Sequence, residues 1–175
     1  ALIKAMVACI RPEPNKTIGD PACGTGGFFL AAYDFLVANY PLDRAQKLAL
    51  KHSTFAGNEI VASTRRLCLM NMFLHNIGEM DGESPVSSND SLVADDGRRF
   101  HYVLANPPFG KKSSMNFTNE EGEQERDDLT YNRQDFWATT SNKQLNFVQH
   151  IHTILRSDGK AAVVVPDNVL FEGGA

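Results

Sequence analysis

The fold is decided by one stretch of the sequence, Thr17-Ile18-Gly19-Asp20-Pro21-Ala22-Cys23-Gly24-Thr25-Gly26-Gly27-Phe28. Its first part is apolar and ends at a carboxylate, its middle is rich in glycine, and the residues that follow, to about Tyr40, have helical spacing. A strand, a glycine-rich turn and a helix in this order open a Rossmann-type unit, in which glycines let the backbone approach a ligand at the helix amino end. The stretch therefore predicts an α/β fold with a ligand-binding turn.

The turn departs from the dinucleotide-binding pattern in two ways. Gly24, Gly26 and Gly27 are not the full spaced triplet, and Asp20 precedes them. A carboxylate in that position would repel a pyrophosphate but would pair with a cationic group, which favours a cationic nucleoside as the ligand. The alternative is that the glycines serve only tight packing of the strand against the helix.

A second motif, Asn106-Pro107-Pro108-Phe109, follows the apolar run Phe100–Ala105, which predicts a buried strand. Open α/β sheets bind ligands at the carboxyl ends of their strands. Because prolines cannot donate hydrogen bonds, the motif ends the strand with carbonyls available as acceptors, to which Asn106 adds an amide carbonyl. Such acceptors suit a planar amino group, as in adenine or cytosine, and Phe109 offers a ring to stack on it. The alternative is an ordinary proline-rich turn.

Two more carboxylates stand at the ends of predicted strands. Glu59 lies at the end of the predicted strand 54–60, where it could bind both hydroxyls of a ribose; otherwise it is a solvated strand end or an acid at a helix amino terminus. Asp90 lies in residues 89–92, which would close a third strand, and could accept a hydrogen bond from an adenine amino group. A helix cap or a turn is the competing interpretation of Asp90.

Apolar spacing predicts further helices over residues 2–10, 42–53, 61–77 and 146–155, and a buried strand over residues 159–166. The residues expected to face the core from these helices are Leu2, Ile3, Met6, Val7, Ile10, Leu42, Ala45, Leu48, Ala49, Leu67, Met70, Phe73, Leu74, Ile77, Phe147, Val148, Ile151 and Leu155. We expect the sequence to be part of a longer chain, because the first helix begins without a cap and a further crossover unit should follow the last strand.

Residues 110–140 lack hydrophobic periodicity and are rich in Ser, Asn, Glu, Asp and Arg. Such a composition cannot bury enough apolar surface to offset the entropy of ordering. We therefore expect a long polar loop that is mobile.

The composition is that of one globular domain, because 175 residues of which 42% are hydrophobic suffice for a core. A net charge of −4 argues against a free-standing nucleic-acid binder, since affinity for a polyanion comes largely from Lys and Arg. Cys9, Cys23 and Cys68 form no metal-ligand spacing and no even disulfide set, so we expect no metal and a reducing cytoplasm. No apolar run approaches the ~20 residues that cross a bilayer, so we expect no membrane contact.

Together, the motifs closely resemble those of the amino-methylating DNA methyltransferases that use S-adenosylmethionine, in particular the modification subunit of type I restriction-modification systems. Residues 20–28 resemble that family's cofactor motif, residues 106–109 its catalytic motif and residues 166–174 its following loop, and the resemblance covers residues 2–175. It implies a Rossmann-like, doubly wound sheet. Residues 1–175 would be a partial catalytic domain truncated at both ends, with a helical region and a further cofactor-binding segment before it and the last strands of the sheet after it.

The resemblance also implies a site and a reaction. The cofactor site would comprise Asp20, Ala22, Gly24, Thr25, Gly26, Gly27, Phe28, Glu59, Asp90 and Ser91, and the catalytic motif Asn106, Pro107, Pro108 and Phe109. The methyl group would pass directly from the cofactor to the N6 amino group of an adenine flipped out of DNA. The implied partners are DNA, a specificity subunit, a second modification subunit and a restriction/translocase subunit.

Two alternatives remain open. The Asn-Pro-Pro-Phe tetrapeptide also occurs in methyltransferases that act on RNA or on protein glutamine. The fold would also suit a cofactor-binding module that does no chemistry.

Overall fold

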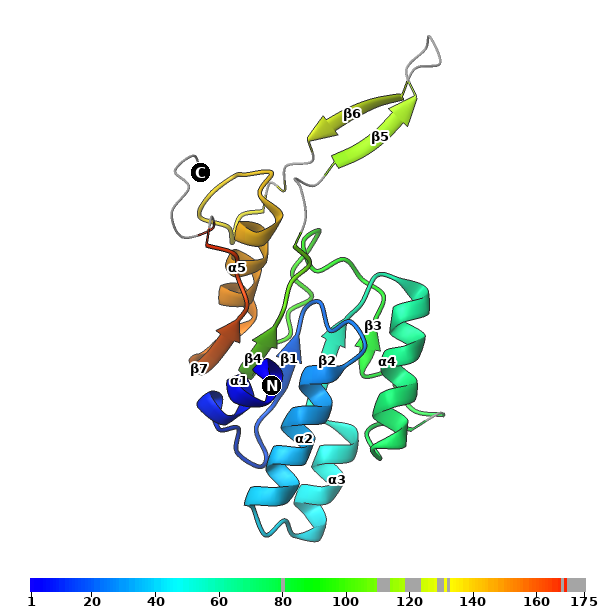
Figure 1. The fold of residues 1–175 in the computed structure, drawn as a ribbon, viewed down its shortest axis with the longest axis vertical. Helices are drawn as coiled ribbons and strands as arrows, with labels where there is room; N and C mark the ends of the chain where they lie inside the picture. The colour runs from blue at the N-terminus through cyan, green and yellow to red at the C-terminus, as the bar shows by residue number, and fades with distance from the viewer. Residues whose placement is uncertain are drawn as a thin grey trace.

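The computed structural model describes residues 1–79, 81–109, 131, 133–167 and 169, together with the backbone of residues 114–118 and 124–128. Within this part of the chain, the centre of the molecule is a five-stranded sheet in the order β3-β2-β1-β4-β7, and each pair of neighbouring strands is parallel (Figure 1). The strands are β1 (Ile18–Asp20), β2 (Phe55–Asn58), β3 (Val86–Ser87), β4 (Phe100–Ala105) and β7 (Leu155–Val163). The chain order reverses between β1 and β4, which leaves a crevice at their carboxyl ends. The predicted doubly wound fold is confirmed.

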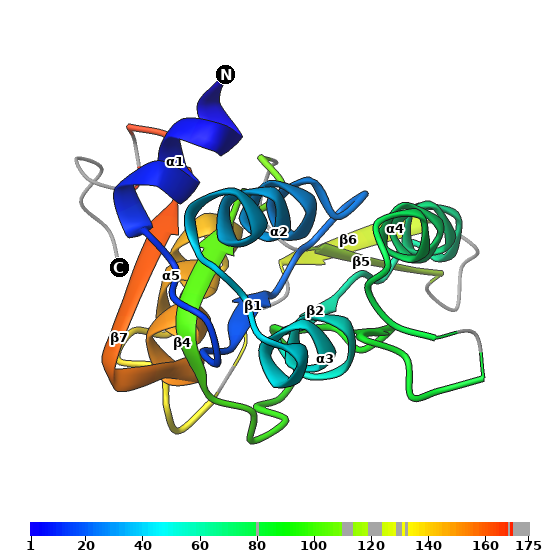
Figure 2. The same ribbon diagram turned by 90° about the horizontal axis from the view of Figure 1, so that it is seen from below.

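Helices cover both faces of this sheet. They are α1 (Leu2–Ile10), α2 (Gly27–Asn39), α3 (Arg44–His52), α4 (Ala62–Leu74) and α5 (Lys143–Ile154). Helices α1 and α2 lie on one face, and α5 lies on the other (Figure 2). The predicted helices are thus confirmed, with ends that differ from the predictions by a few residues.

Strand β4 shows why the sheet has a layer of core on each face. Its residues Tyr102 and Leu104 belong to the apolar cluster that α1, α2 and α4 form on one face. Val103 and Ala105 belong to a second cluster, formed with α5 on the opposite face. A strand buried on both faces needs a continuous apolar run, and this is the pattern from which β4 was predicted.

Three predicted inward faces are only partly right. On α1, Val7 and Ile10 are buried as predicted, but Leu2 and Ile3 are exposed. On α4, Leu67 and Met70 are more than half exposed and Leu74 is 81% exposed, whereas Cys68 and Met72 are fully buried. The helix is rotated in this way because Cys68 packs against the turn before α2, where a Cβ at Gly26 would lie 2.9 Å from its Sγ. On α3 the buried residue is likewise Leu50, and the predicted Leu48 is exposed. Apolar residues occur on more than one face of α3 and α4, and their packing partners select the buried one.

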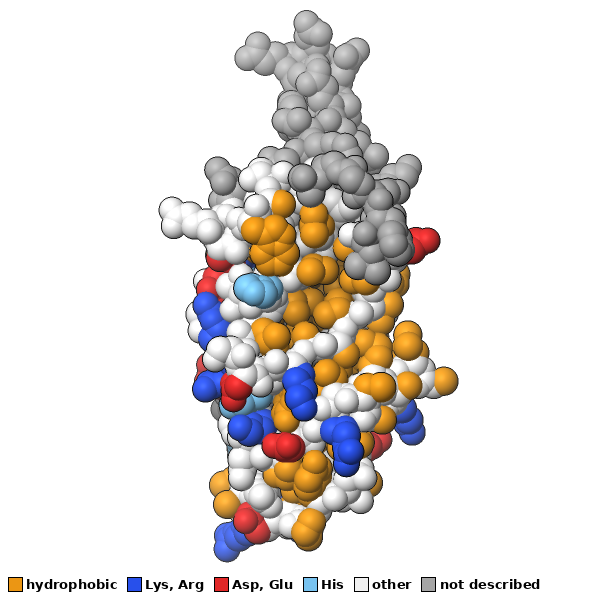
Figure 3. Space-filling view, turned by 90° about the vertical axis from the view of Figure 1, so that its left-hand side faces the viewer, with side chains coloured by type: hydrophobic (Ala, Val, Ile, Leu, Met, Phe, Trp, Pro, Cys, Tyr) orange, Lys and Arg blue, Asp and Glu red, His pale blue; other side chains and the backbone are white. Residues whose placement is uncertain are grey.

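The third strand and the last strand also differ from the predictions. The third strand is Val86–Ser87, and residues 89–92 contain a turn in which Asp90 Oδ1 accepts a hydrogen bond from Leu92 N at 2.9 Å. Strand β7 is half-exposed rather than buried, and among the described residues it pairs with β4 alone, with a register shift between the Phe100 and Tyr102 pairings. Hydrophobic side chains gather on the side of the molecule where β7 lies (Figure 3). Sequence alone could not show that this apolar run has one neighbouring strand among the described residues.

The expected polar loop contains a hairpin. Strands β5 (Ser114–Thr118) and β6 (Gln124–Asp128) pair in antiparallel fashion and lie beyond the carboxyl ends of the sheet strands (Figure 1). The predicted polar loop thus includes a hairpin, and its mobility stays a prediction. Residues 110–113, 119–123, 129, 130 and 132, to which the expected mobility also applies, lie outside the described part of the chain.

Candidate functional site

A cavity of about 400 Å³ lies at the carboxyl ends of the central strands, a volume typical of small-molecule sites. It joins the turn after β1, the acid after β2, the loop after β3, the motif after β4 and the amino end of α5. The lining residues are Pro21, Ala22, Gly24, Asn58, Glu59, Ile60, Val61, Thr64, Asp90, Ser91, Asn106, Pro108, Lys143 and Phe147. The sheet thus brings residues from both sequence motifs to one cavity.

The predicted site residues divide between this cavity and its surroundings. Those that line it are Ala22, Gly24, Glu59, Asp90, Ser91, Asn106 and Pro108. Those outside its lining are Asp20, Thr25, Gly26, Gly27, Phe28, Pro107 and Phe109. Phe28 is buried in the apolar cluster on the α2 face, so its position is that of a core residue.

The glycines of the turn have two different roles. Gly26 has φ 82° and is packed so closely on Cys68 that a side chain there would collide with it. Gly24 has φ 56°, lines the cavity, and would have no atom within 4 Å of a Cβ. Tight packing therefore explains Gly26, whereas backbone conformation and an open approach to the cavity explain Gly24.

Glu59 closes the glycine-rich turn from the side of β2. Its Oε2 accepts a hydrogen bond from Gly24 N at 3.1 Å, and its Oε1 accepts one from Val61 N at 2.8 Å. A carboxylate has about four lone-pair sites, so Glu59 retains acceptor capacity toward the cavity it lines. This geometry suits a pair of neighbouring hydroxyl groups.

Asp20 lies at the end of β1, is 2% exposed, and accepts a hydrogen bond from Ala22 N at 3.0 Å. It lines a separate small cavity of about 10 Å³, which it shares with Arg98 and His150. Burial raises the pKa of its carboxyl group to about 7, with a smaller contribution from the charge of Glu59, and the Ala22 N–H opposes the shift. A nearby cation would favour the ionised form.

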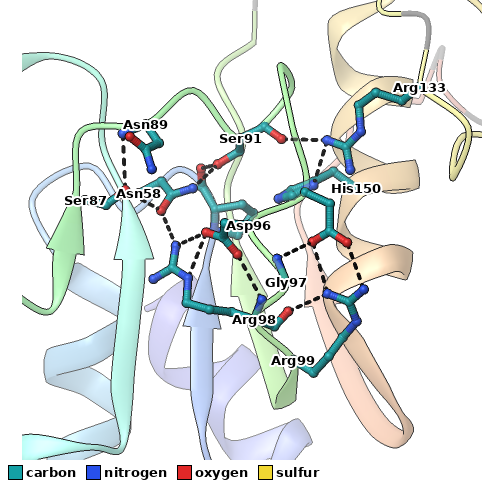
Figure 4. A network of polar contacts seen from close by, with 12 residues as sticks. Asn58, Ser87, Asn89, Ser91, Asp96, Gly97, Arg98, Arg99, Arg133 and His150 are labelled. Atoms are coloured by element: carbon teal, nitrogen blue, oxygen red, sulfur yellow. Dashed lines mark hydrogen bonds and ion pairs between the residues drawn. The ribbon is translucent and has the colours of Figure 1, made fainter.

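A polar network, which the sequence did not predict, holds the strand ends beneath the cavity (Figure 4). Asn58 is buried at the end of β2. Its Nδ2 donates to Ser91 Oγ at 2.8 Å, and its Oδ1 accepts from Ser87 Oγ at 3.0 Å and from Arg98. Ser91 Oγ in turn donates to Pro21 O at 2.7 Å. The one signal in the sequence was the position of Asn58 beside Glu59 at a strand end.

The far end of the cavity is more open. Asn106 and Pro108 are exposed, and Phe109 is 56% exposed. Lys143 and Phe147, from α5, line the cavity together with Asn106 and were not predicted as site residues. Asn142 begins α5 by accepting a hydrogen bond from Leu145 N at 3.1 Å, and this cap places Lys143 in the first turn of the helix. Spacing from the Asn-Pro-Pro-Phe motif gave no signal for either residue.

Within the described residues, no group of three or more His, Cys, Asp or Glu side chains is placed to hold a metal ion. In the same part of the chain, no helix has both the length and the apolar character that a membrane crossing requires.

Comparison with solved structures assigns the class of fold. The chain is similar to a class I S-adenosylmethionine-dependent methyltransferase of Listeria monocytogenes, with a TM-score of 0.59 at 14% identity over 97% of this chain and 45% of that one. An identity this low shows a shared fold alone. The two proteins therefore share a Rossmann-like fold.

Sequence comparison assigns the family. The model of the family described as N-6 DNA Methylase matches residues 1–175, and the chain belongs to this family. It is 39% identical over 180 residues to the methylase subunit of the type I restriction enzyme EcoKI of Escherichia coli K12. The crystal structure of the EcoKI M protein matches with a TM-score of 0.80 at 38% identity, covering 99% of this chain and 34% of that chain. Residues 1–175 span about a third of the length of the curated relative, 31%.

Proposed function

We propose that this chain is the catalytic part of an enzyme that transfers a methyl group from S-adenosylmethionine to the N6 amino group of adenine in DNA. The observation that carries the proposal is that one cavity joins the Gly24 turn and Glu59 to Asn106 and Pro108. A methyl donor and an amino acceptor must lie next to each other for direct transfer, and a shared cavity allows this. The family and the similarity to type I methylase subunits support the same reaction.

The residues at the inner end of the cavity fit S-adenosylmethionine. Glu59 has lone pairs free for the ribose hydroxyls, and Asp90 lines the cavity where it would accept a hydrogen bond from the adenine amino group. Gly24 leaves the backbone open to the methionine part. The negative charge of Asp20, on the other side of the glycine-rich turn, would stabilise the cationic groups of the bound cofactor. The cofactor supplies a methyl group on a sulfonium, whose departure leaves a neutral thioether and needs no metal.

The residues at the outer end fit the target base. The side-chain carbonyl of Asn106 and the backbone carbonyl of Pro107 would accept the two hydrogens of the adenine amino group, which frees its nitrogen lone pair for attack on the methyl carbon. The methylated nitrogen then loses one of these protons, which would pass to water because Asn106 is exposed. Phe109, being exposed, is available to stack on a base that has left the duplex. The protein contributes mainly position and charge stabilisation in this scheme.

The proposed setting is a type I restriction-modification complex in the cytoplasm. The partners would be DNA, a specificity subunit that reads the sequence, a second modification subunit and the restriction/translocase subunit. A net charge of −4 supports the need for a separate DNA-reading subunit.

The test is methyl transfer from labelled S-adenosylmethionine by the intact subunit assembled with its specificity partner. We expect labelled N6-methyladenine in duplex DNA and no label in RNA or in protein glutamine. Transfer to RNA or to glutamine would replace the proposed substrate. Cofactor binding without transfer to any of the three would favour a non-catalytic cofactor-binding module.

A further inference from the structure

The last residues of the expected loop, 133–140, are bound to α5. Ala138 N donates to Gln149 Oε1 at 2.8 Å, and Gln149 Nε2 donates back to Ala138 O at 3.0 Å. Asn146 Nδ2 donates to Thr140 O at 2.9 Å. Because Gln149 and Asn146 are fully buried, these hydrogen bonds are shielded from water. Helix α5 and the segment 133–140 therefore form one unit.

Arg133 joins this unit to the loop after β3 (Figure 4). The Arg133 side chain is 7% exposed, and its Nη1 donates to Ser91 O at 2.8 Å. The same Nη1 lies 3.1 Å from His150 Nδ1 on α5, which accepts a hydrogen bond when the ring carries its proton on Nε2. Within its own segment, Arg133 Nε donates to Asp135 at 3.0 Å, and the guanidinium carbon lies 4.3 Å from the centre of the Phe136 ring.

The environment of His150 keeps its imidazole neutral, and a neutral ring can accept a hydrogen bond from Arg133. The side chain is buried, and burial, with the Arg133 charge, lowers the pKa of the imidazole to about 4. The ring is therefore neutral at pH 7, and Arg133 has an acceptor on α5 as well as on the Ser91 loop.

Two of the three acceptor residues of Arg133, Ser91 and His150, belong to segments that line opposite ends of the cavity. Ser91 lines the cavity beside Asp90 and is bonded through its hydroxyl to Pro21 and Asn58, which also line it. Helix α5 contributes Lys143 and Phe147 to the end that holds Asn106. Arg133 itself does not line the cavity, so any effect on a ligand passes through these neighbours.

We propose that Arg133 is a positioning residue that couples the two ends of the cavity, so that a bound cofactor and a bound target adenine strengthen each other's binding. This inference rests on the proposed function. A shift of α5 toward a bound base would move the guanidinium and, with it, the Ser91 wall on the cofactor side. Coupling between two sites is reciprocal in free energy, so it can be measured from either ligand.

The experiment uses the intact subunit with its specificity partner and S-adenosylhomocysteine, which does not react. The ratio of its Kd without DNA to its Kd with saturating target DNA measures the coupling. We expect a ratio of about 5 or more for the wild type, the lower end of typical couplings, and a ratio near 1 for Arg133→Lys. Lysine keeps the charge but cannot form the fork of hydrogen bonds to Ser91, His150 and Asp135. The Kd without DNA should change much less than the ratio does, because Arg133 does not line the cavity.

The matched control is Arg99→Lys. Arg99 is an exposed arginine bound to Asp95 in the loop between β3 and β4, and it does not line the cavity. For Arg99→Lys, the ratio of the Kd without DNA to the Kd with DNA should equal that of the wild type. A second pair of variants keeps the test decisive if Arg133→Lys does not fold. His150→Asn keeps an acceptor and should retain the coupling, whereas His150→Leu removes the acceptor and should lose it.

The outcomes separate the inference from the proposed function. A wild-type ratio of 1, or unchanged ratios in both Arg133→Lys and His150→Leu, overturns the coupling role even if methyl transfer to DNA is normal. A wild-type complex that binds no cofactor overturns the proposed function itself.

Discussion

The two ends of the cavity are built in opposite ways. At the inner end the candidate residues are bonded to one another: Glu59 accepts from Gly24 N, and buried Asn58 donates to Ser91. At the outer end Asn106 and Phe109 are exposed, and within the described residues the Asn106 side chain makes no hydrogen bond. The inner end is therefore organised by hydrogen bonds of the fold itself, whereas the Asn106 side chain, which has no hydrogen-bond partner among the described residues, is available to a substrate. Changes at the inner end should therefore act on binding, and changes at the outer end on rate.

The largest effect should come from the outer end. Asn106→Ala should lower kcat for DNA methylation by about 10²–10³, as removal of one positioned transition-state group does elsewhere, and should leave the cofactor Kd unchanged. Single-turnover transfer and calorimetric titration measure the two quantities. The control is Asn39→Ala, which removes a surface hydrogen bond at the end of α2. Methylation at the wild-type rate would show that Asn106 is not the acceptor.

At the inner end, Glu59→Gln should weaken cofactor binding by about 10–100-fold, because hydrogen bonds to a charged group contribute ~1.5–3 kcal/mol. At saturating cofactor, kcat should change little, which is the reverse of the result for Asn106. Titration calorimetry gives the Kd, and steady-state kinetics gives kcat. Glu79→Gln, which alters an ion pair with Lys51 on the surface, is the control. An unchanged Kd would remove Glu59 from the cofactor site.

Asp20 should make cofactor binding depend on pH. Its pKa is raised to about 7, so the carboxyl group must lose a proton when a cationic cofactor stabilises the charge. Affinity should rise by about tenfold per pH unit up to pH 7 and level off above it. Titration in two buffers of different ionisation enthalpy should detect release of up to one proton. Asp20→Asn should abolish the dependence, and Asp34→Asn, at an exposed site, should retain it.

The raised pKa of Asp20 also determines the direction in which the stability of the folded protein changes with pH. Because the folded-state pKa is raised, the contribution of Asp20 to stability is fully present below its ordinary pKa of 3.8 and is lost as the pH rises through about 7. Asp20→Asn should therefore raise the Tm of the cofactor-free protein more at pH 8 than at pH 5. A larger rise at pH 5 would contradict the assigned direction.

The smallest effect is expected at Lys143, which lines the outer end near Asn106. If its ammonium group contacts a DNA phosphate, Lys143→Gln should reduce the slope of log K against log salt concentration by about 1 and leave the cofactor Kd unchanged. DNA binding of the assembled complex at several salt concentrations measures the slope. Lys160→Gln, at an exposed position of β7, is the control. An unchanged slope would place Lys143 away from the phosphates.

The sequence predicted the parts of this molecule whose pattern is local. The turn after β1 was found because glycines and a carboxylate occur together, and β4 because a strand buried on both faces needs a continuous apolar run. The convergence of Glu59 and Asn106 on one cavity followed from the rule that ligands bind at the carboxyl ends of parallel strands.

The parts that the sequence did not reveal depend on partners far along the chain. Asn146, Gln149 and His150 are polar, and their burial is possible only because the backbone and side chains of residues 133–140 accept or donate the matching hydrogen bonds. The buried face of α4 was misassigned for a similar reason, since Cys68 was selected over Leu67 by its contact with Gly26. No pattern within either helix carries that information.

The central place of β1 in the sheet has a consequence for the time at which the protein can fold. Ile18 pairs with Phe55 on one side and with Tyr102 on the other, and Thr17 N bonds to His101, which lies 84 residues later. At a synthesis rate of about 5–20 residues per second, roughly 4–17 s pass between the two ends of that contact. Hairpins form in ~1–10 μs, so the time needed for synthesis is far longer than the time needed for strand pairing. One edge of β1 therefore stays unpaired in the nascent chain for seconds. The strand that carries the glycine-rich turn can therefore be completed only after Tyr102 has been made, and until then its open edge is available to chaperones or to a neighbouring nascent chain.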